Sequence, residues 1–183
     1  MIYATTVSNN KELEQIIELQ QQNLKQHLSA EEKQSQGFVT VVHTPAMLQQ
    51  MHHYGASIIV KDNEALAGYA LTMMNDYKND VPELLGMFAV LDAQEWKGKG
   101  LPNYRYYVMG QICVSSNYRG QGIFDMLYQK HKEVYQPQFD LLVTEISTSN
   151  HRSQRAHERV GFKTIYTYRD VIDEWNVVVW DWC

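Results

Sequence analysis

The sequence predicts an α/β (mixed α+β) fold, in which a central mixed sheet of about seven strands carries helices on both faces. The order of apolar and amphipathic segments is strand, two helices, a run of strands, and then strand–helix–strand–helix–strand–strand. The strands near residues 110 and 143 are joined through a helix, which predicts parallel neighbours with a right-handed crossover. The 183 residues predict one domain over 1–183, long enough to bury a core.

The N-terminal part of the chain predicts a strand, two helices and a hairpin. Residues 2–7 are expected to form the strand, and residues 8–28 a helix in which Asn9 and Glu12 resemble a capping box. Helical spacing marks the buried stripe of this helix at Leu13, Ile16, Ile17, Leu24 and Leu28. A second helix over 44–54 carries Pro45 in its first turn, and residues 56–62 and 65–74 predict a hairpin.

The C-terminal part opens with a long connection, residues 75–104, which mixes polar turns with a short apolar patch. Connections of this length in compact domains are often functional. The elements expected after it are strands over 105–116 and 140–147 with a helix between them, a helix over 150–161 that Gly161 ends, and strands over 162–170 and 175–182.

Composition excludes several classes of protein. A formal charge of −5 argues against a general nucleic-acid binder. The sequence contains no run of about 18 apolar residues, so no membrane span is expected. The N-terminus lacks the basic and apolar regions of a signal peptide. Cys113 and Cys183 are the only cysteines, so a disulfide framework is excluded, and neither has metal-site spacing. We therefore expect a cytoplasmic protein without a metal.

The segment SSNYRGQGIFDMLY (115–128) places two glycines and an arginine at the start of a helix. The backbone amides of residues 120–124 have no intrahelical partners, and with the helix dipole they favour an anion such as pyrophosphate, which Arg119 would also contact. The alternative is a plain connector whose glycines only make the turn. A Walker loop would need Gly-Lys-Ser/Thr at Gly122, and a dinucleotide fingerprint would need glycine at Asp125.

Two segments together resemble the GNAT superfamily of N-acyltransferases. The first resembles its acyl-CoA pyrophosphate loop, Gln/Arg-x-x-Gly-x-Gly/Ala: Arg119 and Gly122 match, and Phe124 stands where a small residue is usual. The second, NHRSQRAHERVGF (150–162), resembles the family's second conserved segment at Asn150, Ser153, Glu158, Arg159, Gly161 and Phe162. The resemblance implies a GNAT fold, whose mostly antiparallel sheet has two splayed central parallel strands. It also implies acetyl transfer from acetyl-CoA to a primary amine of a small molecule or peptide, by direct attack in a ternary complex.

The resemblance also implies where the cofactor binds. The pantetheine arm would pair with the backbone of the strand at residues 112–114, and amides near Cys113 and Val114 would polarise the thioester carbonyl. Asn150 is expected as a helix N-cap, as a ligand of the CoA arm, or as both. Cys113 has no recognisable base beside it and is expected to be a core residue. The predicted cofactor-binding residues are Ile112, Cys113, Val114, Arg119, Gly120, Gln121, Gly122, Ile123, Phe124, Asn150 and Ser153.

His157 and Glu145 are the predicted catalytic residues. His157 occupies the position of the tyrosine that protonates the CoA thiolate in many family members, but helical spacing directs it toward the sheet, where a core histidine is the alternative. Glu145 interrupts the apolar run LLVTEIS; it either faces the splayed cleft and orients water or the acceptor amine, or pairs with Arg152 or Arg155. Several family members use a glutamate on the preceding strand as the base, but the nearby positions here hold Gln111 and Met109, neither of which can take a proton. The general base is therefore open, with a water chain as one possibility.

The acceptor side is less defined by the sequence. One set of aromatic residues either packs in the core or lines an acceptor pocket: Tyr54, Tyr69, Tyr77, Trp96, Tyr104, Tyr106 and Tyr107. The acidic residues of the long connection either are simply solvated or attract a cationic amine: Asp76, Asp80, Glu83, Asp92 and Glu95. The C-terminal WNVVVWDW offers a surface for a homodimer. The alternative to an enzyme is a non-catalytic acyl-CoA-binding sensor or interaction module on the same fold.

Overall fold

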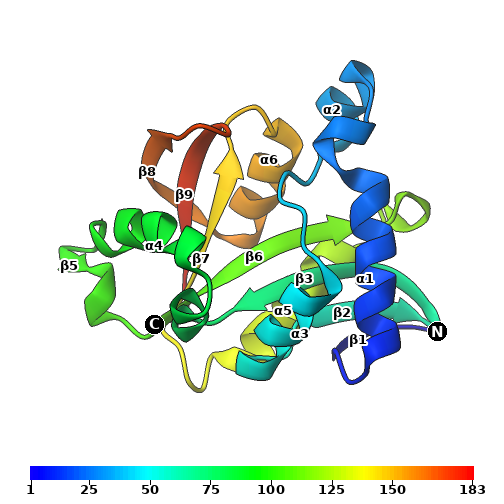
Figure 1. Ribbon diagram of the computed structural model, residues 1–183, viewed down its shortest axis with the longest axis horizontal. Helices are drawn as coiled ribbons and strands as arrows, with labels where there is room; N and C mark the ends of the chain where they lie inside the picture. Colours follow the sequence, from blue (N-terminus) through cyan, green and yellow to red (C-terminus); the bar gives the residue numbers. More distant parts are fainter.

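The computed structural model describes residues 1–183, except for the side chain of Gln34. Within these residues, seven strands form one mixed sheet, as the sequence predicted, and their order is β1-β2-β3-β6-β7-β9-β8 (Figure 1). The strands are β1 (Ile2–Thr6), β2 (Ile58–Asp62), β3 (Ala65–Met73), β6 (Tyr106–Val114), β7 (Leu141–Ser147), β8 (Lys163–Arg169) and β9 (Glu174–Asp181). All neighbouring pairs are antiparallel except β6 and β7, which are parallel.

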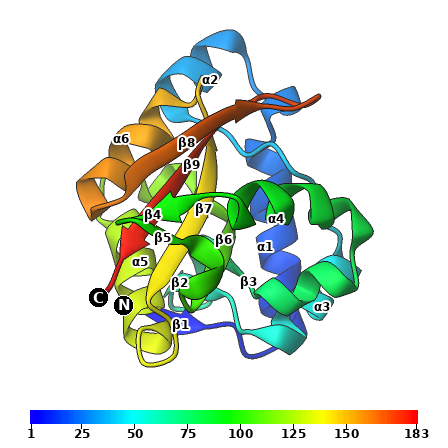
Figure 2. The same cartoon turned by 90° about the vertical axis from the view of Figure 1, so that its left-hand side faces the viewer.

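Helices cover both faces of this sheet (Figure 2). One face of the sheet packs against three helices, α1 (Asn10–Asn23), α3 (Pro45–Tyr54) and α4 (Leu85–Asp92), and residues of these helices and strands form one hydrophobic core cluster. Residues of α5 (Ile123–Tyr135) belong to the cluster on the opposite face, against which α6 (His151–Val160) also packs. None of the helices in the described part of the chain is both long and apolar enough to cross a membrane.

The first helix is shorter than the sequence predicted. Asn9 caps it as expected, because its side chain accepts a hydrogen bond from the Glu12 amide at 3.1 Å. The helix ends at Asn23, since Leu24 is extended (ψ 132°), and a short 3₁₀ turn, η1 (Lys25–His27), follows. A further helix that was not predicted, α2 (Ala30–Gln36), begins with a capping box between Ser29 and Glu32.

The long connection folds into short elements. It contains the 3₁₀ turns η2 (Asn75–Asn79), η3 (Pro82–Leu84) and η4 (Leu101–Asn103), the helix α4, and a small hairpin of β4 (Glu95–Trp96) and β5 (Lys99–Gly100). The indole Nε1 of Trp96 donates to the Asp181 carboxylate at 2.9 Å, which ties this hairpin to the end of β9. The hairpin is therefore tied to the end of β9, whereas η2 of the same connection lies against β6 and α3.

The parallel strands β6 and β7 diverge. Their ladder joins residues 106–108 to residues 141–143, whereas both strands continue well beyond it. At the point of divergence, the Thr144 hydroxyl donates to the Met109 carbonyl at 2.8 Å and takes the place of a ladder bond. The predicted splay between two central parallel strands is therefore present, and it exposes backbone of both strands inside the molecule.

Candidate functional site

The turn between β6 and α5 is shaped for close approach of a ligand. Gly120 and Gly122 have φ of +76° and +78°, a conformation that favours glycine, and Gly122 is the N-cap of α5. The Met126 amide donates to the Gly122 carbonyl at 3.0 Å, so the amides between these residues precede the helix's own hydrogen bonds. A Cβ on either glycine would point into open space, at least 4 Å from the described atoms. The turn is therefore open on the side where an anion would lie.

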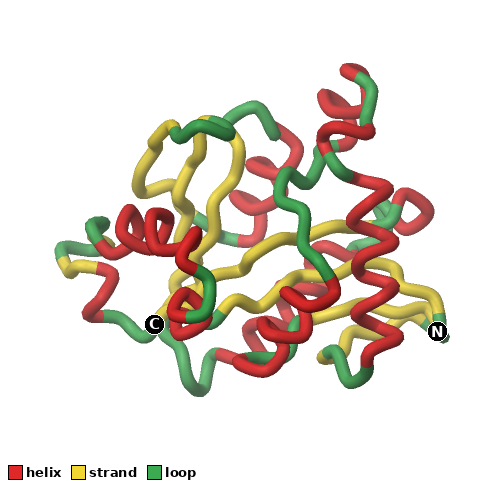
Figure 3. Tube along the Cα trace, in the orientation of Figure 1, coloured by secondary structure: helices red, strands yellow, loops and turns green.

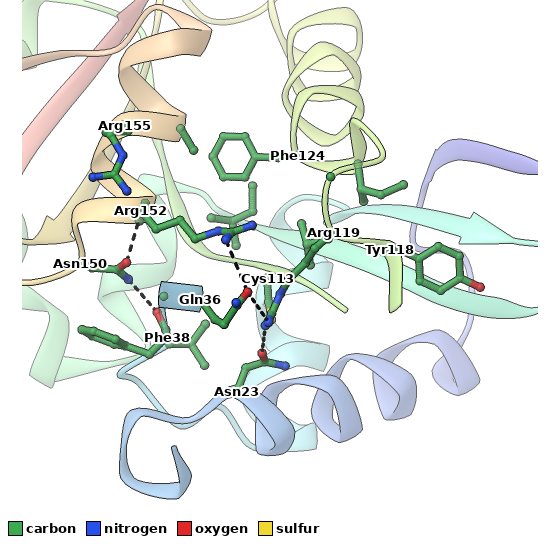
Figure 4. Close-up of a pocket in the computed structure, with 18 of the residues that line it drawn as sticks. Asn23, Gln36, Phe38, Cys113, Tyr118, Arg119, Phe124, Asn150, Arg152 and Arg155 are labelled. Carbon is green, nitrogen blue, oxygen red and sulfur yellow. Dashed lines mark hydrogen bonds between the residues drawn. The ribbon is translucent and has the colours of Figure 1, made fainter. Parts of the chain in front are cut away.

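This turn opens onto a cavity of about 700 Å³, which we call the basic cleft (Figure 4). Four arginines and one carboxylate line it: Arg119, Arg152, Arg155, Arg159 and Asp125. The predicted cofactor-binding residues also line it, with the exception of Gln121, whose side chain donates to the Asn117 carbonyl at 3.0 Å. The excess of positive charge suits a ligand that carries several negative charges.

Arg119 is held across the cleft by neutral groups. Its guanidinium donates to the side-chain oxygens of Asn23 at 2.8 Å and Gln36 at 3.1 Å, and Arg152 also donates to Gln36 at 3.4 Å (Figure 4). Amide oxygens orient a guanidinium without neutralising its charge. Two arginines from distant parts of the chain are thus gathered around one amide with their charges available to an anion.

The edge of β6 lines the cleft beside this turn. The Ser115 amide donates to the Ala67 carbonyl of β3 at 2.9 Å, so alternate residues of β6 direct their backbone groups toward β3. Ile112 and Val114 consequently direct theirs toward the diverging β7. Cys113 is buried, and burial raises the pKa of its thiol to about 12, as suits a core residue and not a nucleophile.

Asn150 links α6 to a loop on the other side of the cleft. Its side-chain oxygen accepts a hydrogen bond from the Ser153 amide at 3.2 Å, which makes it the N-cap of α6, as predicted. Its side-chain nitrogen donates to the Phe38 carbonyl at 3.0 Å. The side-chain oxygen of Asn150 therefore caps α6, and its nitrogen joins the start of α6 to the loop at residue 38.

His157 is fully enclosed on the sheet side of α6. Its Nδ1 lies 2.8 Å from the Ser153 carbonyl and 3.3 Å from the Ser153 hydroxyl, and its Nε2 lies 2.6 Å from the Tyr128 hydroxyl. Because a carbonyl only accepts, Nδ1 carries the proton and Nε2 accepts from Tyr128. Burial lowers the pKa of His157 to about 4, so the ring is neutral at pH 7. Phe124 packs edge-on against it, with ring centroids 5.1 Å apart.

A second, smaller cavity of about 80 Å³, the Glu145 pocket, lies between the diverging strands. Residues of β6, β7 and the loop at residue 38 line it, together with Ser153, His157 and Trp175. The Tyr168 hydroxyl donates to the Glu145 carboxylate at 2.8 Å. Burial raises the pKa of Glu145 from its ordinary 4.5 to about 7. The structure gives Glu145 a tyrosine partner from β8 and places it in the pocket, instead of the arginine partners weighed from the sequence.

Residues 37–42, the crossing segment, form the wall that the sequence did not predict. The segment runs as a loop in front of β6 (Figure 3) and contributes to the lining of both cavities. The Gln111 side chain of β6 donates to the Val41 carbonyl at 2.8 Å, and the Val39 amide donates to the Asn23 carbonyl at 3.0 Å. Its sequence signal is the apolar run FVTVV after Gly37, which matches neither a helix nor a strand of the sheet.

None of the aromatic residues proposed for the acceptor pocket lines the Glu145 pocket, although the Tyr69 hydroxyl donates to Gln111, which does. Tyr69, Tyr77, Tyr106 and Tyr107 are buried in the core. The Tyr54 hydroxyl donates to Asp80, that of Tyr106 to Asp92 and that of Tyr104 to the Trp96 carbonyl. These contacts also occupy two of the acidic residues considered for amine binding. The aromatic residues at the Glu145 pocket are instead Phe38 of the crossing segment and, from the hairpin of β8 and β9, Tyr168 and Trp175.

Comparisons with known proteins support one family. A family model described as the acetyltransferase (GNAT) family matches residues 13–162. Among curated proteins, no sequence matches the chain. The fold resembles that of the ribosomal-protein-S18-alanine N-acetyltransferase from Escherichia coli, at 13% identity and a TM-score of 0.65, with 99% of this chain and 94% of that chain covered.

Two further solved structures share the fold. A GNAT-family acetyltransferase from Streptococcus agalactiae aligns at 14% identity and a TM-score of 0.68, with 98% of this chain and 95% of that chain covered. The protein yncA from Salmonella typhimurium, solved with its cofactor acetyl-CoA, aligns at 14% identity and a TM-score of 0.63, with 98% and 93% covered. At these identities the likeness concerns the fold.

Proposed function

The chain belongs to the GNAT family of acetyltransferases, and we propose that it transfers the acetyl group of acetyl-CoA to a primary amine by direct attack in a ternary complex. The observation that carries this proposal is the meeting of two unlike cavities at the splay of β6 and β7. The basic cleft and the Glu145 pocket share the lining residues Phe38, Val39, Ile112, Asn150 and Ser153. A cofactor in one cavity and an acceptor in the other would therefore meet there.

The basic cleft has the chemistry to hold acetyl-CoA, which supplies an activated acetyl thioester when bound. The amides of residues 120–124 and the guanidinium of Arg119 would hold its pyrophosphate, and Arg152 and Arg155 would hold further phosphate charge. The backbone groups of Ile112 and Val114 face the gap and would pair with the amides of the pantetheine arm. Since β1 starts at residue 2 and β9 ends at residue 181 of the same sheet, we propose that 1–183 act as one domain.

Glu145 is the proposed general base. Its carboxyl group lines the smaller pocket, and a pKa of about 7 leaves a substantial fraction ionised at neutral pH, when it can accept the proton of an ammonium. The Tyr168 hydroxyl donates to one carboxylate oxygen and fixes its orientation. The other oxygen of the same carboxylate is then available to the acceptor. Gln111, on the neighbouring strand, has no comparable basic group.

His157 is proposed to assist the departing CoA thiolate indirectly, by orienting Ser153. The Ser153 hydroxyl lines both cavities, whereas His157 lines the smaller pocket and is covered by Phe124 on its other side. The Nδ1 proton of His157 lies within reach of the Ser153 hydroxyl oxygen, which leaves the hydroxyl proton free to hydrogen-bond to the departing sulfur. His157 would thus orient the group that contacts the leaving thiolate.

Calorimetry with acetyl-CoA, followed by a thiol-release assay over a panel of primary amines, tests the function. We expect saturable binding, and thiol release that depends on both the amine and Glu145. Binding without turnover on any amine would favour a non-catalytic acyl-CoA sensor instead. Competition by ATP or NAD but not by CoA would contradict the assignment of the basic cleft.

A further inference from the structure

The Glu145 pocket is bordered by aromatic side chains of the C-terminal hairpin. Trp175 of β9 lines it, and Tyr168 of β8 binds Glu145 directly. Tyr166 continues this wall outward, since its ring lies nearly parallel to that of Tyr168 (17° between planes, centroids 6.3 Å apart), and its side chain is exposed. On the opposite side, Val41 of the crossing segment lines the pocket and is itself 44% exposed. A carboxylate thus lies at the inner end of an apolar and aromatic passage.

An ion pair bridges this passage near its end at Ser147. Lys25 of η1 and Asp173 of the β8–β9 turn are 2.8 Å apart, although they are separated by 148 positions in the sequence. Asp173 also accepts a hydrogen bond from the Ser147 hydroxyl at 2.9 Å, and the Lys25 ammonium lies 4.9 Å from the centroid of the Phe38 ring. Ser147 and Phe38 both line the Glu145 pocket.

The bridge restricts what can reach Glu145. It joins the C-terminal hairpin to η1 and, through Phe38, to the crossing segment, so the two walls of the passage are tied together at that end. At the other end, the bond between Thr144 and the Met109 carbonyl closes the gap between β6 and β7. A polypeptide must continue as an extended chain away from its N-terminal amine, whereas the body of a small amine can end within a passage whose walls are tied at both ends.

From this arrangement we infer that the acceptor is a small primary amine with an apolar or aromatic body, and not the N-terminus of a polypeptide. Its ammonium would bind Glu145, and its body would pack against Tyr168, Tyr166 and Val41. The inference rests on the proposed acetyltransferase function and names the substrate class for its acceptor site. An aromatic body would stack on these rings or pack edge-on against them.

The test compares three acceptors in the thiol-release assay: phenethylamine, ethylamine, and an eight-residue peptide with a free N-terminus and no lysine. For the unmodified protein we expect a kcat/KM for phenethylamine at least about tenfold above that for either other acceptor, because apolar contacts of this size discriminate by about 10–200-fold. Tyr166→Ala should lower the preference for phenethylamine over ethylamine at least about threefold. Equal or better use of the peptide by the unmodified protein would overturn the inference.

Opening the bridge should admit longer acceptors. Asp173→Asn and Lys25→Met each remove the ion pair, and we expect each to raise the peptide-to-phenethylamine ratio of kcat/KM at least about fivefold. Lys11→Met, which removes the exposed Lys11–Glu64 pair elsewhere, is the matched control and should leave the ratio as it was. Melting temperatures of the variants identify any that do not fold. An unchanged ratio in both folded bridge variants contradicts the inference, whereas absence of turnover with every amine contradicts the proposed function itself.

Discussion

Replacement of Glu145 by glutamine should make the protein more stable and far less active. The glutamine has nearly the same shape, and its carbonyl can still accept the hydrogen bond that Tyr168 donates to the carboxylate at 2.8 Å. The substitution removes only the negative charge, which burial between the diverging strands makes unfavourable. An ionised carboxylate held at this cost is typical of a group whose basicity is used.

The size of the effect follows from the pKa. Below about pH 4.5 the carboxyl is protonated in both the folded and the unfolded chain, and its contribution to stability is fully present. As the pH rises from 4.5 toward 7, the unfolded chain loses its proton first, so the free energy of unfolding decreases. The difference between 4.5 and about 7 corresponds to about 3 kcal/mol above pH 7, or roughly 6–12 °C in melting temperature for a chain of this length.

Thermal unfolding of both proteins from pH 5 to pH 8 provides the assay. The Glu145→Gln variant should melt close to the unmodified protein at pH 5 and well above it at pH 8, while Glu14→Gln, on the exposed face of α1, should show no such trend. In parallel, kcat/KM of the unmodified protein should rise with pH through about 7, and the variant should lose this limb and about 10²–10⁴ of its rate. A melting difference that stays constant with pH would refute the reasoning, because it would mean that Glu145 titrates alike in both states.

Three further substitutions test other parts of the structure. Gly122→Asp should raise the Kd for acetyl-CoA at least about 100-fold by calorimetry, and Gly122→Asn, which tolerates the same backbone, should have a much smaller effect. Gly68→Ala should lower the free energy of unfolding in urea by about 1–3 kcal/mol, because the new Cβ would lie 2.9 Å from the backbone carbonyl oxygen of Cys113. Gly110→Ala is the control: its Cβ comes no closer than 3.4 Å to any neighbour, and that neighbour is the flexible end of Met51, so it should cost less than about 1 kcal/mol. His157→Phe should lower kcat about tenfold or more, with little change in the Kd for acetyl-CoA, and should destabilise the protein by about 1–3 kcal/mol because it orphans the Tyr128 hydroxyl. Adding Tyr128→Phe should restore stability but not turnover; full turnover in the double variant would leave His157 with a packing role.

The sheet, its parallel pair and the turn at Gly122 were predictable from the sequence because each depends on local pattern. Alternating apolar runs mark the strands, and the helix between 116 and 140 requires the two strands that flank it to be parallel. The glycines at 120 and 122 occupy positive φ, a requirement that is visible as glycine in the sequence. The predicted length of α1 was wrong because its helical spacing continues to Leu28, although the chain is already extended at Leu24, which pairs with Val39 of the crossing segment.

The proposed acceptor side was not predictable in the same way, because it is assembled from distant residues by side-chain contacts. Nothing in the local sequence relates Lys25 to Asp173, or Tyr168 to Glu145, and these pairs define the passage. The sequence indicated that Glu145 was costly to bury but could not identify its partner. The long connection is rich in aromatic residues, but Trp96 bonds to the end of β9 and Tyr77 packs against Tyr54 of α3, and neither lines the Glu145 pocket.

The division of roles between Gln111 and Glu145 explains why the proposed base is on β7. Gln111 accepts a hydrogen bond from the Tyr69 hydroxyl at 2.6 Å through its amide oxygen and donates one to the Val41 carbonyl at 2.8 Å through its amide nitrogen, and an ionised carboxylate could only accept. An ionised glutamate at position 111 would lack the donor that holds the crossing segment, which walls both cavities. The strand nearer the crossing segment therefore carries the amide that fixes it, and the diverging strand carries the carboxylate. The pocket between the diverging β6 and β7 is lined by residues of both strands, so under the proposed function a base on either strand would reach the acceptor without a change of fold.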